Sequence, residues 1–528
     1  MSERGLIFLY GPPLVGKSTL GEAFARHMDV PFWDVDEIIT ARAGLDIEEI
    51  FREYGEAAFR RWEFDALRSL CTKKCGVVAL GGGALTQPRA LDLVEESGEL
   101  LLLTASQDAL VKRMTPNTGV RPLLGEDPEQ GLERLLEKRS SHYASFSKRI
   151  CVEGKPEKEL IEEVEIALGR FRVTGMGRAY EVHICPGCLD EIGQAMSDGG
   201  YDGSVVVVTD DRVGELYGRR VVNALRKAGF HCSLYVFPAG ERSKTVDTLR
   251  EVWRHFVDIG IERGSTVVAL GGGVTGDLAG FAAASFHRGI QWINIPTSLL
   301  AMVDASLGGK TGVNLPQGKN LLGAFHPPRQ VWVDPEVLHT LPEKELHSGL
   351  AEVIKHGVID DADLFTLSSK GRNGVDRQWS ELISRAVGVK ARVVREDPYE
   401  QGLRQILNFG HTVGHGVEHV SRYRLRHGEA VAIGMVAETY LAERLGLAPR
   451  GLSRGLADVL SEWNLPLIIP THLPEEDIVK TVKRDKKIVR GQLRFSLPFG
   501  LGDVRHGIEV REEDWRESLR FNKEDIYG

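Results

Sequence analysis

The heptapeptide VVALGGG occurs twice in the chain, at residues 77–83 and again at residues 267–273. Each copy is a short apolar run that favours a buried strand, followed at once by three glycines. A strand that ends in backbone without side chains is typical of an open α/β sheet, which binds its ligands at the carboxyl ends of its strands. The two copies therefore predict two ligand sites in an α/β protein.

The residues that follow the two copies are unrelated: GGGALTQPRALDLVEE follows the first and GGGVTGDLAGFAAASF the second. A true internal repeat would keep its similarity over a whole supersecondary unit. We therefore interpret the shared heptapeptide as convergence on one physical requirement rather than as a duplicated domain.

Three domains are expected from a chain of 528 residues at roughly 150 residues per domain. Strand and helix patterns alternate through the first part, which predicts a parallel sheet covered by helices in residues 1–170. The glycines of GRFRVTGMGRAY mark the boundary to a second alternating α/β segment, residues 171–334. Helical patterns dominate after Asp334, so residues 335–528 are expected to form a mainly α-helical domain. A Pro- and Gly-rich stretch, residues 114–128, is predicted to be a lid or binding loop.

The composition excludes several classes of protein. There is no apolar run of the ~18 residues that a membrane helix needs, and the start of the chain leads directly into a glycine loop, so neither a membrane span nor a signal peptide is expected. We predict a cytoplasmic protein. Its net charge of −9 argues against general binding to nucleic acid. Six cysteines are too few for a disulfide framework, and we interpret the pairs Cys71/Cys75 and Cys185/Cys188 as incidental thiols.

A phosphate-binding loop is predicted at residues 11–18, GPPLVGKS, between an expected strand and an expected helix. In such a loop the backbone N–H groups surround the phosphates of a nucleotide, Lys17 contacts the outer phosphates, and Ser18 can hold Mg²⁺. Without this role the pairing of Lys17 and Ser18 would be unexplained.

Two further patterns indicate chemistry in the second half. Gly271, Gly273 and Gly276 have the spacing of a dinucleotide-binding turn, but no acidic residue ends the next strand, so this fingerprint is incomplete. His411 and His415 lie about 40° apart on one helix face, close enough to share a metal. With a carboxylate from upstream they would make a three-ligand zinc site with an open position.

The first 170 residues resemble shikimate kinase, through the phosphate loop and the motifs FWDVDEII, FRRWE, GGG, RPLL and KRSSHY. The resemblance implies that ATP and Mg²⁺ are held by Gly11, Gly16, Lys17, Ser18, Thr19, Asp34 and Arg121. It implies that shikimate is held by Asp36, Arg60, Gly81, Gly82, Gly83 and Arg139, with Asp36, Lys17 and Arg121 catalytic. One departure stands in the loop: the family usually has glycine at position 14, where this chain has Leu14, and usually lacks Pro12 and Pro13.

From about Val173 onward the chain resembles 3-dehydroquinate synthase, through PAGERSK, GGGVTGDLAGF, PTSLLAMVDASLGGKTGVNLPQGKN, LAEVIKHG, LNFGHTVGHGVEH and RHGEAVAIGM. The resemblance implies a metal, zinc or alternatively cobalt, on Glu352, His411 and His427, with His415 left to the substrate. It implies NAD on Asp210, Glu241, Lys244, Gly272, Gly273, Val274, Asp277, Thr297, Ser298, Lys310, Lys319 and Thr340. The heptulosonate phosphate substrate would contact Arg288, Asp304, Lys310, Asn320, Lys355, Lys390, Arg404, Asn408 and His415, of which Lys310, Lys355 and His415 are catalytic.

The two resemblances together imply a fused shikimate-pathway enzyme that acts on shikimate, ATP and heptulosonate phosphate, and a homodimer through the synthase part. The resemblance to the synthase family implies the following reaction. NAD⁺ oxidises one substrate hydroxyl to a ketone, phosphate is eliminated, NADH returns the hydride to the substrate, and the opened ring closes to a carbocycle. Two alternatives remain open at this point. The second part could cyclise another sugar phosphate, and the first part could be a nucleotide-binding regulatory domain without transferase activity.

Overall fold

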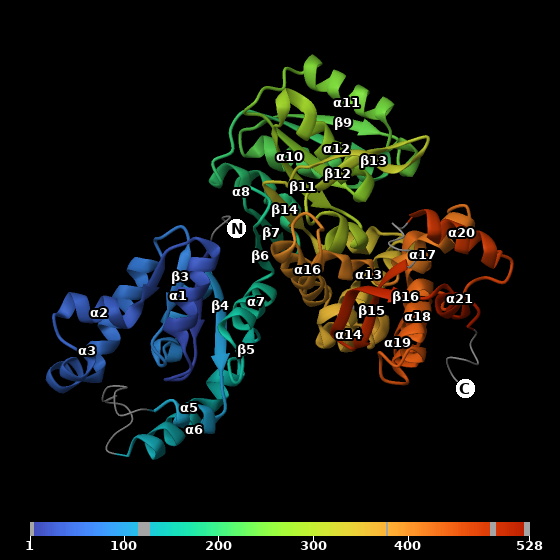
Figure 1. Cartoon of the computed structure of the whole chain (residues 1–528). Coiled ribbons are helices and arrows are strands. Elements are labelled where there is room, and N and C mark those ends of the chain that lie inside the picture. The colour runs from blue at the N-terminus through green and yellow to red at the C-terminus, as the bar shows by residue number, and fades with distance from the viewer. Residues whose placement is uncertain (1–4, 115–126, 376–377, 486–492, 522–528) are drawn as a thin grey trace. The chain divides into compact units, whose positions relative to one another are not determined.

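The computed structural model describes residues 5–114, 127–375, 378–485 and 493–521. The chain divides into two compact units, Met1–Leu168 and Gly169–Gly528, hereafter unit 1 and unit 2. Figure 1 labels their elements along the chain. Most of the predicted lid at residues 114–128 lies outside the described residues, and Arg121 lies there too.

Unit 1 is built on a five-stranded parallel sheet in the order β2-β3-β1-β4-β5. Its strands are β1 (Leu6–Tyr10), β2 (Phe32–Asp34), β3 (Gly76–Ala79), β4 (Gly98–Thr104) and β5 (Arg149–Cys151). Its helices are α1 (Lys17–Met28), α2 (Val35–Ala43), α3 (Ile47–Leu70), α4 (Pro88–Ser97), α5 (Gln107–Lys112), α6 (Pro128–Ala144) and α7 (Glu157–Leu168). The strand and helix alternation predicted from the sequence is confirmed.

Both faces of this sheet are buried, which explains why β1 is apolar throughout. Successive side chains of a strand point to opposite faces. Phe8 and Tyr10 of β1 therefore enter one core cluster, whereas Ile7 and Leu9 enter the other. A strand covered by helices on both sides has no polar face, so its sequence is a continuous apolar run rather than an alternating one.

Unit 2 contains a seven-stranded sheet in the order β6-β7-β14-β11-β10-β8-β9. Its strands are β6 (Arg170–Val173), β7 (Tyr180–Ile184), β8 (Ser204–Asp210), β9 (His231–Phe237), β10 (Thr266–Gly271), β11 (Gln291–Pro296) and β14 (Gln330–Val333). All neighbours are parallel except β6 and β7. Part of the segment expected to be a linker, Arg170–Val173, is therefore the edge strand β6 of this sheet.

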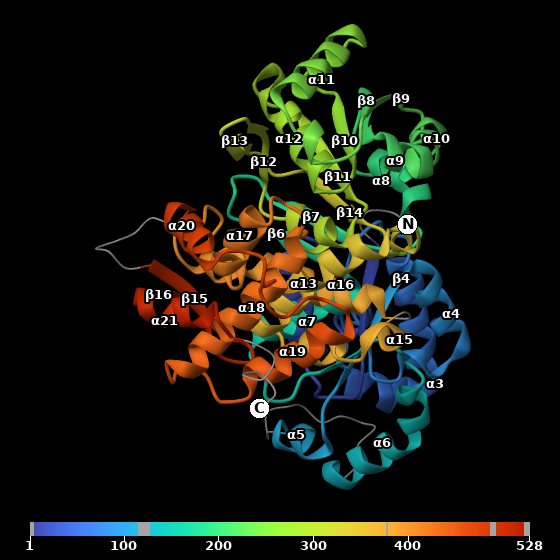
Figure 2. The ribbon, with the colours of Figure 1, turned by 90° about the vertical axis from the view of Figure 1, so that its right-hand side faces the viewer.

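Helices α8 (Ile192–Asp198), α9 (Asp211–Val213), α10 (Arg219–Lys227), α11 (Val246–Asp258) and α12 (Gly273–Ser285) belong to the sheet region. The later helices are α13 (Glu343–Asp360), α14 (Ala362–Ser368), α15 (Gly371–Val375), α16 (Trp379–Glu396), α17 (His411–Val420), α18 (His427–Arg444), α19 (Leu452–Glu462), α20 (Glu475–Asp485) and α21 (Glu512–Ser518). The expected helical character after Asp334 is confirmed. Figure 2 shows α17, α18 and the hairpin β15–β16 packed beside one another.

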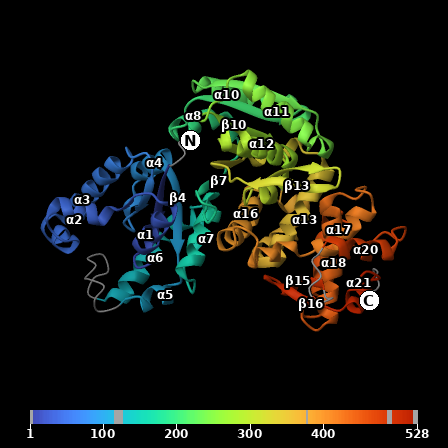
Figure 3. The same cartoon turned by 45° about the horizontal axis from the view of Figure 1, so that its top comes forward.

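The sequence did not predict the two antiparallel hairpins. They are β12 (Lys310–Leu315) with β13 (Gly318–Phe325), and β15 (Leu493–Gly500) with β16 (Asp503–Val510). The register of β15–β16 shifts twice, and that of β12–β13 shifts once. A shift of this kind breaks the period-two alternation by which a strand is recognised in sequence. Both strands of the hairpin β12–β13 pack against α12, and Figure 3 shows β13 beside that helix.

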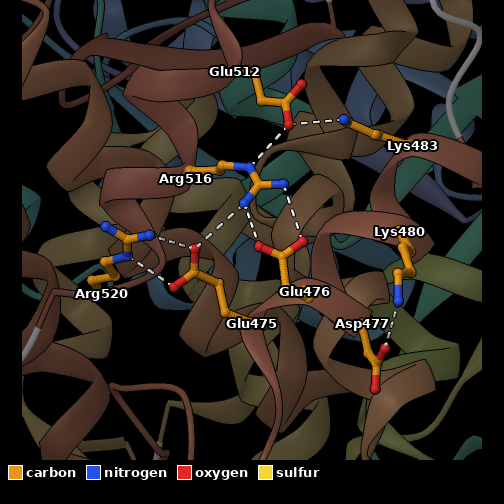
Figure 4. Close-up of polar contacts among 8 residues, drawn as sticks. All are labelled: Glu475, Glu476, Asp477, Lys480, Lys483, Glu512, Arg516 and Arg520. Carbon is orange, nitrogen blue, oxygen red and sulfur yellow. Dashed lines mark hydrogen bonds and ion pairs between the residues drawn. The ribbon is translucent and has the colours of Figure 1, made fainter.

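Helix α20 packs against α17 and is fastened to α21 by ion pairs (Figure 4). Arg516 of α21 contacts Glu476 through both terminal nitrogens, at 2.6 and 3.2 Å, and donates to Glu512 at 2.9 Å. Arg520 makes a two-pronged contact with Glu475, and Lys483 of α20 donates to Glu512 at 2.8 Å. Arg516 of α21 and Arg520, two residues beyond the end of that helix, thus form ion pairs with the acidic start of α20.

Candidate functional site

The predicted phosphate loop of unit 1 joins β1 to α1. Lys17 begins α1, and its Nζ donates to the carbonyl oxygens of Gly11 at 3.0 Å and Pro12 at 2.9 Å, so the ammonium lies across the loop. Leu14 has a φ of 68°, in the left-handed region that disfavours side chains with a Cβ. The backbone at this position thus has the conformation that glycine adopts most easily, although the residue is leucine.

Ser18 and Asp34 meet beside this loop. The Ser18 hydroxyl donates to Asp34 Oδ2 at 2.5 Å, while Asp34 Oδ1 accepts the backbone N–H of Asp36 at 2.9 Å and caps α2. The cap places Asp36 on the first turn of α2. Thr19 follows Ser18 on α1 and is exposed. Serine and aspartate oxygens of this kind are ligands that Mg²⁺ accepts, directly or through water.

The first glycine triplet follows β3 and lies next to the guanidinium groups of Arg60 and Arg139. Arg139 Nη1 donates to the carbonyl oxygen of Gly82 at 2.5 Å, and Tyr10 and Tyr143 donate to the same oxygen at 3.2 and 3.0 Å. A Cβ on Gly83 would lie 2.5 Å from Arg60 Nη2 and 2.8 Å from Arg139 Nη2. The predicted pair Arg60 and Arg139 therefore converges on one point, and only glycine leaves room for it there.

Glu63 is a residue of this site that the sequence did not single out. Its Oε2 accepts from Arg60 Nη1 at 2.7 Å, and the residue is 3% exposed. Burial raises the pKa of the Glu63 carboxyl, although the adjacent Arg60 opposes the shift. A Cβ on Gly81 would meet the carboxylates of Glu63 and Asp36, so all three glycines of the triplet border polar site residues. The position of Glu63 one helical turn after Arg60 was the available sequence signal.

The second glycine triplet, in unit 2, begins a helix as predicted. Gly271 ends β10, Gly272 is the N-cap of α12, and Gly273 and Val274 start that helix. The backbone N–H of Thr297 donates to Gly271 at 3.0 Å, and Ser298 follows it beside Gly272. Asp210, at the end of β8, accepts from Thr275 at 3.5 Å and caps α9. Thr340 is bonded to the Tyr217 hydroxyl at 2.6 Å.

Lys244 joins two groups of predicted residues. It is 5% exposed, and its Nζ donates to the Asp277 carboxylate of α12 and to Asn320 Oδ1 at 2.5 Å. Glu241 accepts from Asn314 at 2.7 Å, and Asn314 in turn accepts the backbone N–H of Asn320 at 2.8 Å. Residues predicted for NAD and a residue predicted for substrate thus share one hydrogen-bonded network. Asn314 belongs to it but was not predicted.

A second set of polar residues surrounds the π-helical turn Ala301–Ala305. Lys390 of α16 donates to the Asp304 backbone carbonyl at 2.6 Å and to the Asp304 carboxylate. Burial opposes ionisation of Asp304, but Lys390, Lys355 and His356 together outweigh it, so the pKa of that carboxyl lies below its usual range. Arg404 is 3% exposed and donates to the carbonyl of Pro398 at 2.6 Å.

Glu400 connects two further predicted residues, Lys310 and Asn408. Its carboxylate accepts from the Lys310 ammonium through one oxygen and from Asn408 Nδ2 at 3.4 Å through the other. The sequence gave no sign of this role, because the two partners lie on different elements. Arg288 is exposed, has a φ of 67°, and lies in the 3-10 turn Phe286–Arg288.

Glu352, His411 and His427 converge from three helices, α13, α17 and α18. Glu352 Oε1 lies 3.7 Å from His411 Nε2 and 3.4 Å from His427 Nε2, and one donor atom of each residue falls within 4.8 Å of the others. Glu352 is 0% exposed, and its Oε1 has no hydrogen-bond partner among the described residues. A buried carboxylate oxygen facing two imidazole nitrogens fits a divalent metal with mixed nitrogen and oxygen ligands, such as zinc or cobalt.

The electrostatics of this triad favour a bound cation. Burial opposes ionisation of Glu352, but Lys355, which donates to Glu352 Oε2, and the histidines hold the pKa of its carboxyl well below the usual range. Burial, reinforced by Lys355, lowers the pKa of His411. Burial also disfavours charge on His427, yet the carboxylates of Glu352 and Glu418 beside its ring raise its pKa to about 9. The carboxylates of Glu352 and Glu418 lie on either side of the His427 ring, and their negative charge stabilises a cation bound there.

His415 lies beside the triad rather than in it. Its ring centroid is 5.2 Å from that of His411 and 6.0 Å from that of His427. Two other groups could also hold a metal by distance alone: His415, Glu418 and His427, or Asp304, Glu352 and His356. Glu418 accepts from Lys319 at 3.1 Å and contacts His427 Nδ1 at 3.3 Å, so its carboxylate is already engaged. Asp304 of the other group is likewise engaged with Lys390. Glu352 belongs to that group too, but only with His411 and His427 is its unpartnered Oε1 combined with two imidazoles in one of the three groups.

Three family models match the chain in succession. Residues 14–168 match shikimate kinase, residues 234–348 match the 3-dehydroquinate synthase N-terminal family, and residues 349–488 match the 3-dehydroquinate synthase C-terminal family. The 3-dehydroquinate synthase of Synechocystis sp. is 45% identical over 347 residues, which cover 64% of this chain and 96% of the relative. Across the described residues, no helix combines the length and apolarity needed to cross a membrane.

Two solved structures resemble unit 2. One is 2-deoxy-scyllo-inosose synthase complexed with carbaglucose-6-phosphate, NAD⁺ and Co²⁺, with a TM-score of 0.61 and 27% identity over 66% of this chain and 99% of that one. The other is 2-epi-5-epi-valiolone synthase from Streptomyces hygroscopicus with NAD⁺ and Zn²⁺ bound, with a TM-score of 0.59 and 30% identity over 66% of this chain and 98% of that one.

Proposed function

We propose the roles of the site residues from one premise: the chain belongs to the 3-dehydroquinate synthase family, and a shikimate kinase domain precedes the synthase. It is a bifunctional shikimate-pathway enzyme. The identity of 45% to a 3-dehydroquinate synthase, against 27–30% to cyclases of other sugar phosphates, disfavours the alternative that the second part makes another product.

In the kinase, we assign shikimate to the space bordered by Asp36, Arg60, Arg139 and the glycines 81–83. Two planar guanidiniums that meet over Gly83 suit a carboxylate, which each can bind through paired hydrogen bonds. Asp36 would accept the proton of the attacking hydroxyl, whose oxygen then takes the transferred phosphoryl group. The observation that carries this assignment is the convergence of Arg60 and Arg139.

ATP with Mg²⁺ is assigned to Gly11, Gly16, Lys17, Ser18, Thr19 and Asp34, together with Arg121 outside the described residues. Mg²⁺ would neutralise phosphate charge as the γ-phosphoryl group leaves. Lys17 would exchange its two loop carbonyls for phosphate oxygens, and Asp34 would orient Ser18 toward the ion.

In the synthase, we assign a divalent metal, zinc or cobalt, to Glu352, His411 and His427, and NAD to the start of α12. NAD⁺ would take up and return a hydride, and the metal would polarise substrate hydroxyls. The N-terminus of α12 and its glycines suit a pyrophosphate. Lys244, Asp277, Glu241, Asp210, Thr297, Ser298, Lys310, Lys319 and Thr340 complete the proposed NAD surroundings.

The anionic substrate of the synthase is assigned to the cations Lys310, Lys355, Lys390 and Arg404, with Asp304, Asn320, Asn408 and His415. Lys355 and Lys390 are each paired with a carboxylate. These pairs orient the two ammonium groups and balance their buried charge before a substrate anion binds. His415, beside the metal triad, would exchange a proton with a substrate hydroxyl.

We further propose a homodimer that acts in the cytoplasm, with residues 1–170, 171–334 and 335–528 as its three functional segments. The dimer is supported by apolar side chains on the hairpin β12–β13, where Leu321, Leu322 and Phe325 are 57%, 40% and 47% exposed. Arg288, exposed in its turn, would then reach the substrate site of the partner copy.

The assignment is tested with two variants of the full chain. Lys17→Ala removes the phosphate contact and should abolish shikimate phosphorylation while the synthase rate stays unchanged. His411→Ala should abolish synthase activity and metal binding while the kinase rate stays unchanged. Loss of both activities in either variant would contradict the assignment of each site to its own unit.

A further inference from the structure

The first turn of α17, which carries His411, lacks a cap from its own sequence. The N-cap residue is Gly410, in the left-handed region at a φ of 79°, and it has no side chain to accept a hydrogen bond. The first N–H groups of a helix have no partner within the helix and must be satisfied elsewhere when they are buried. His411 and Val413 in this turn are both buried.

Glu438 of α18 supplies the missing cap. Its Oε2 accepts the backbone N–H of Gly410 at 2.7 Å, and its Oε1 accepts the backbone N–H of Val413 at 3.0 Å. The residue is 0% exposed. A carboxylate is a strong acceptor at a helix N-terminus, where the helix dipole also favours negative charge. Both carboxylate oxygens are therefore bound to the two residues that flank His411 and Thr412.

The two helices also touch at this point through backbone. A Cβ on Gly410 would lie 2.5 Å from Met435 Cγ and 3.0 Å from the carbonyl oxygen of Val431, both on α18. The first turn of α17 thus packs directly against α18, and the two hydrogen bonds of Glu438 determine its position relative to α18. Helix α18 also begins with His427, so one helix both carries a metal ligand and holds the turn that carries another.

We infer that Glu438 is a positioning residue for the metal site: by holding the first turn of α17 against α18, it keeps His411 Nε2 within reach of Glu352 and His427. This inference rests on the proposed metal triad. Its carboxylate accepts the backbone N–H groups of Gly410 and Val413, so it acts on the backbone on both sides of His411. The distance of 3.7 Å between His411 Nε2 and Glu352 Oε1 is the quantity that it maintains.

The alternative is that Glu438 stabilises α17 without affecting the metal site. A second glutamate of α18, Glu443, provides a control variant that tests this alternative. Glu443, also on α18, accepts the backbone N–H of Ser453 at 2.7 Å and so caps the first turn of α19. In both cases a glutamate of α18 accepts backbone N–H from the first turn of another helix, one N–H for Glu443 and two for Glu438, but α19 carries none of the proposed ligands. Glu443→Gln therefore reports the effect of losing a carboxylate cap without moving the metal site.

The test measures zinc bound per full-length chain in solutions of buffered free Zn²⁺, for the wild type, Glu438→Gln and Glu443→Gln. The Gln side chain keeps one acceptor and turns an NH₂ group toward the second N–H. We expect Glu438→Gln to weaken Zn²⁺ binding roughly tenfold to a hundredfold, as substitutions next to a ligand typically do. Glu443→Gln should bind zinc as the wild type does. The circular dichroism and thermal unfolding of each chain report whether unit 2 is folded, and the kinase rate reports that unit 1 is intact.

Wild-type zinc affinity in Glu438→Gln, or equal weakening in Glu443→Gln, would overturn the inference. If Glu438→Gln loses the fold of unit 2, Glu438→Asp is measured instead, because it keeps the charge but withdraws the carboxylate by one methylene; unchanged zinc affinity there would also overturn it. A wild-type chain that binds no zinc or cobalt would refute the proposed triad itself, which separates the two failures.

Discussion

Lys390 donates to both the backbone carbonyl and the side-chain carboxylate of Asp304, so a buried ammonium is held at the π-helical turn of unit 2. Burial lowers the pKa of Lys390 to about 8, with Arg404 and Lys355 adding to the shift and Asp304 opposing it. A lysine with a lowered pKa loses its charge as the pH rises through that value, well before an exposed lysine does.

We therefore expect kcat/KM of the synthase to fall above about pH 8, because neutral Lys390 binds an anionic substrate less well. A pH profile of the synthase rate measures this. Lys390→Arg keeps its charge throughout, so its profile should lack the decline near pH 8 even if its maximum is lower. An identical decline in Lys390→Arg would assign the titration to another group.

Leu14 provides a test of the unusual phosphate loop. Its φ of 68° costs a leucine roughly 1–2 kcal/mol, whereas glycine adopts it freely at a cost of about 0.5–1 kcal/mol in unfolded-chain entropy. Leu14→Gly should therefore leave the stability of unit 1 within about 1 kcal/mol of the wild type and retain phosphoryl transfer. Leu14→Val, with a β-branched side chain, should lose both. Thermal unfolding and kinase rates check this, and a Val variant as active as the wild type would contradict it.

Gly83→Ala should damage shikimate binding specifically. The added methyl group would collide with the guanidiniums of Arg60 and Arg139, which must then separate. We expect KM for shikimate to rise at least roughly tenfold, since a displaced bidentate contact costs about 1.5–3 kcal/mol, while KM for ATP changes little. The synthase rate of the same chain is the control. Unchanged shikimate KM would show that the two arginines do not clamp its carboxylate there.

The ion pairs of α20 and α21 predict a stability that depends on salt. Arg516 pairs with Glu475, Glu476 and Glu512, so Arg516→Gln removes three ion pairs at once and should lower the unfolding temperature of unit 2. The difference from the wild type should shrink at high ionic strength, because exposed pairs are screened. Arg505→Gln, which loses a pair with Asp503 two residues away and a contact with the Phe499 ring, should have a smaller effect. Equal effects of the two variants would argue against a cooperative network.

The metal site illustrates what the sequence could predict. Helical periodicity finds residues on one face of one helix, so spacing alone paired His411 with His415. The proposed ligand set Glu352, His411 and His427 comes from three helices, and its choice depended on resemblance to a family. Both approaches identified His411, because it belongs to both patterns.

Three of the residues that the sequence analysis missed have partners that are distant in sequence. Glu438, Glu400 and Asn314 each gain a role only when another element packs against them, and a lone Glu or Asn on a helix or hairpin is usually a solvated surface group. Glu63 is different, since it follows Arg60 by one helical turn and could have been inferred from that spacing.

Helix α20 packs directly against α17. Arg516 of α21 and Arg520, just beyond that helix, form ion pairs with glutamates of α20. Leu168, which ends unit 1, is separated from Glu512, which begins α21, by 344 positions. At about 5–20 residues per second, a ribosome needs roughly 17–70 seconds to cover that stretch. During this interval the nascent kinase is already complete, whereas the helix that carries His411 still lacks its support. The amino-terminal domain therefore has time to fold on its own, and unit 2 can complete its packing only after α21 has been synthesised.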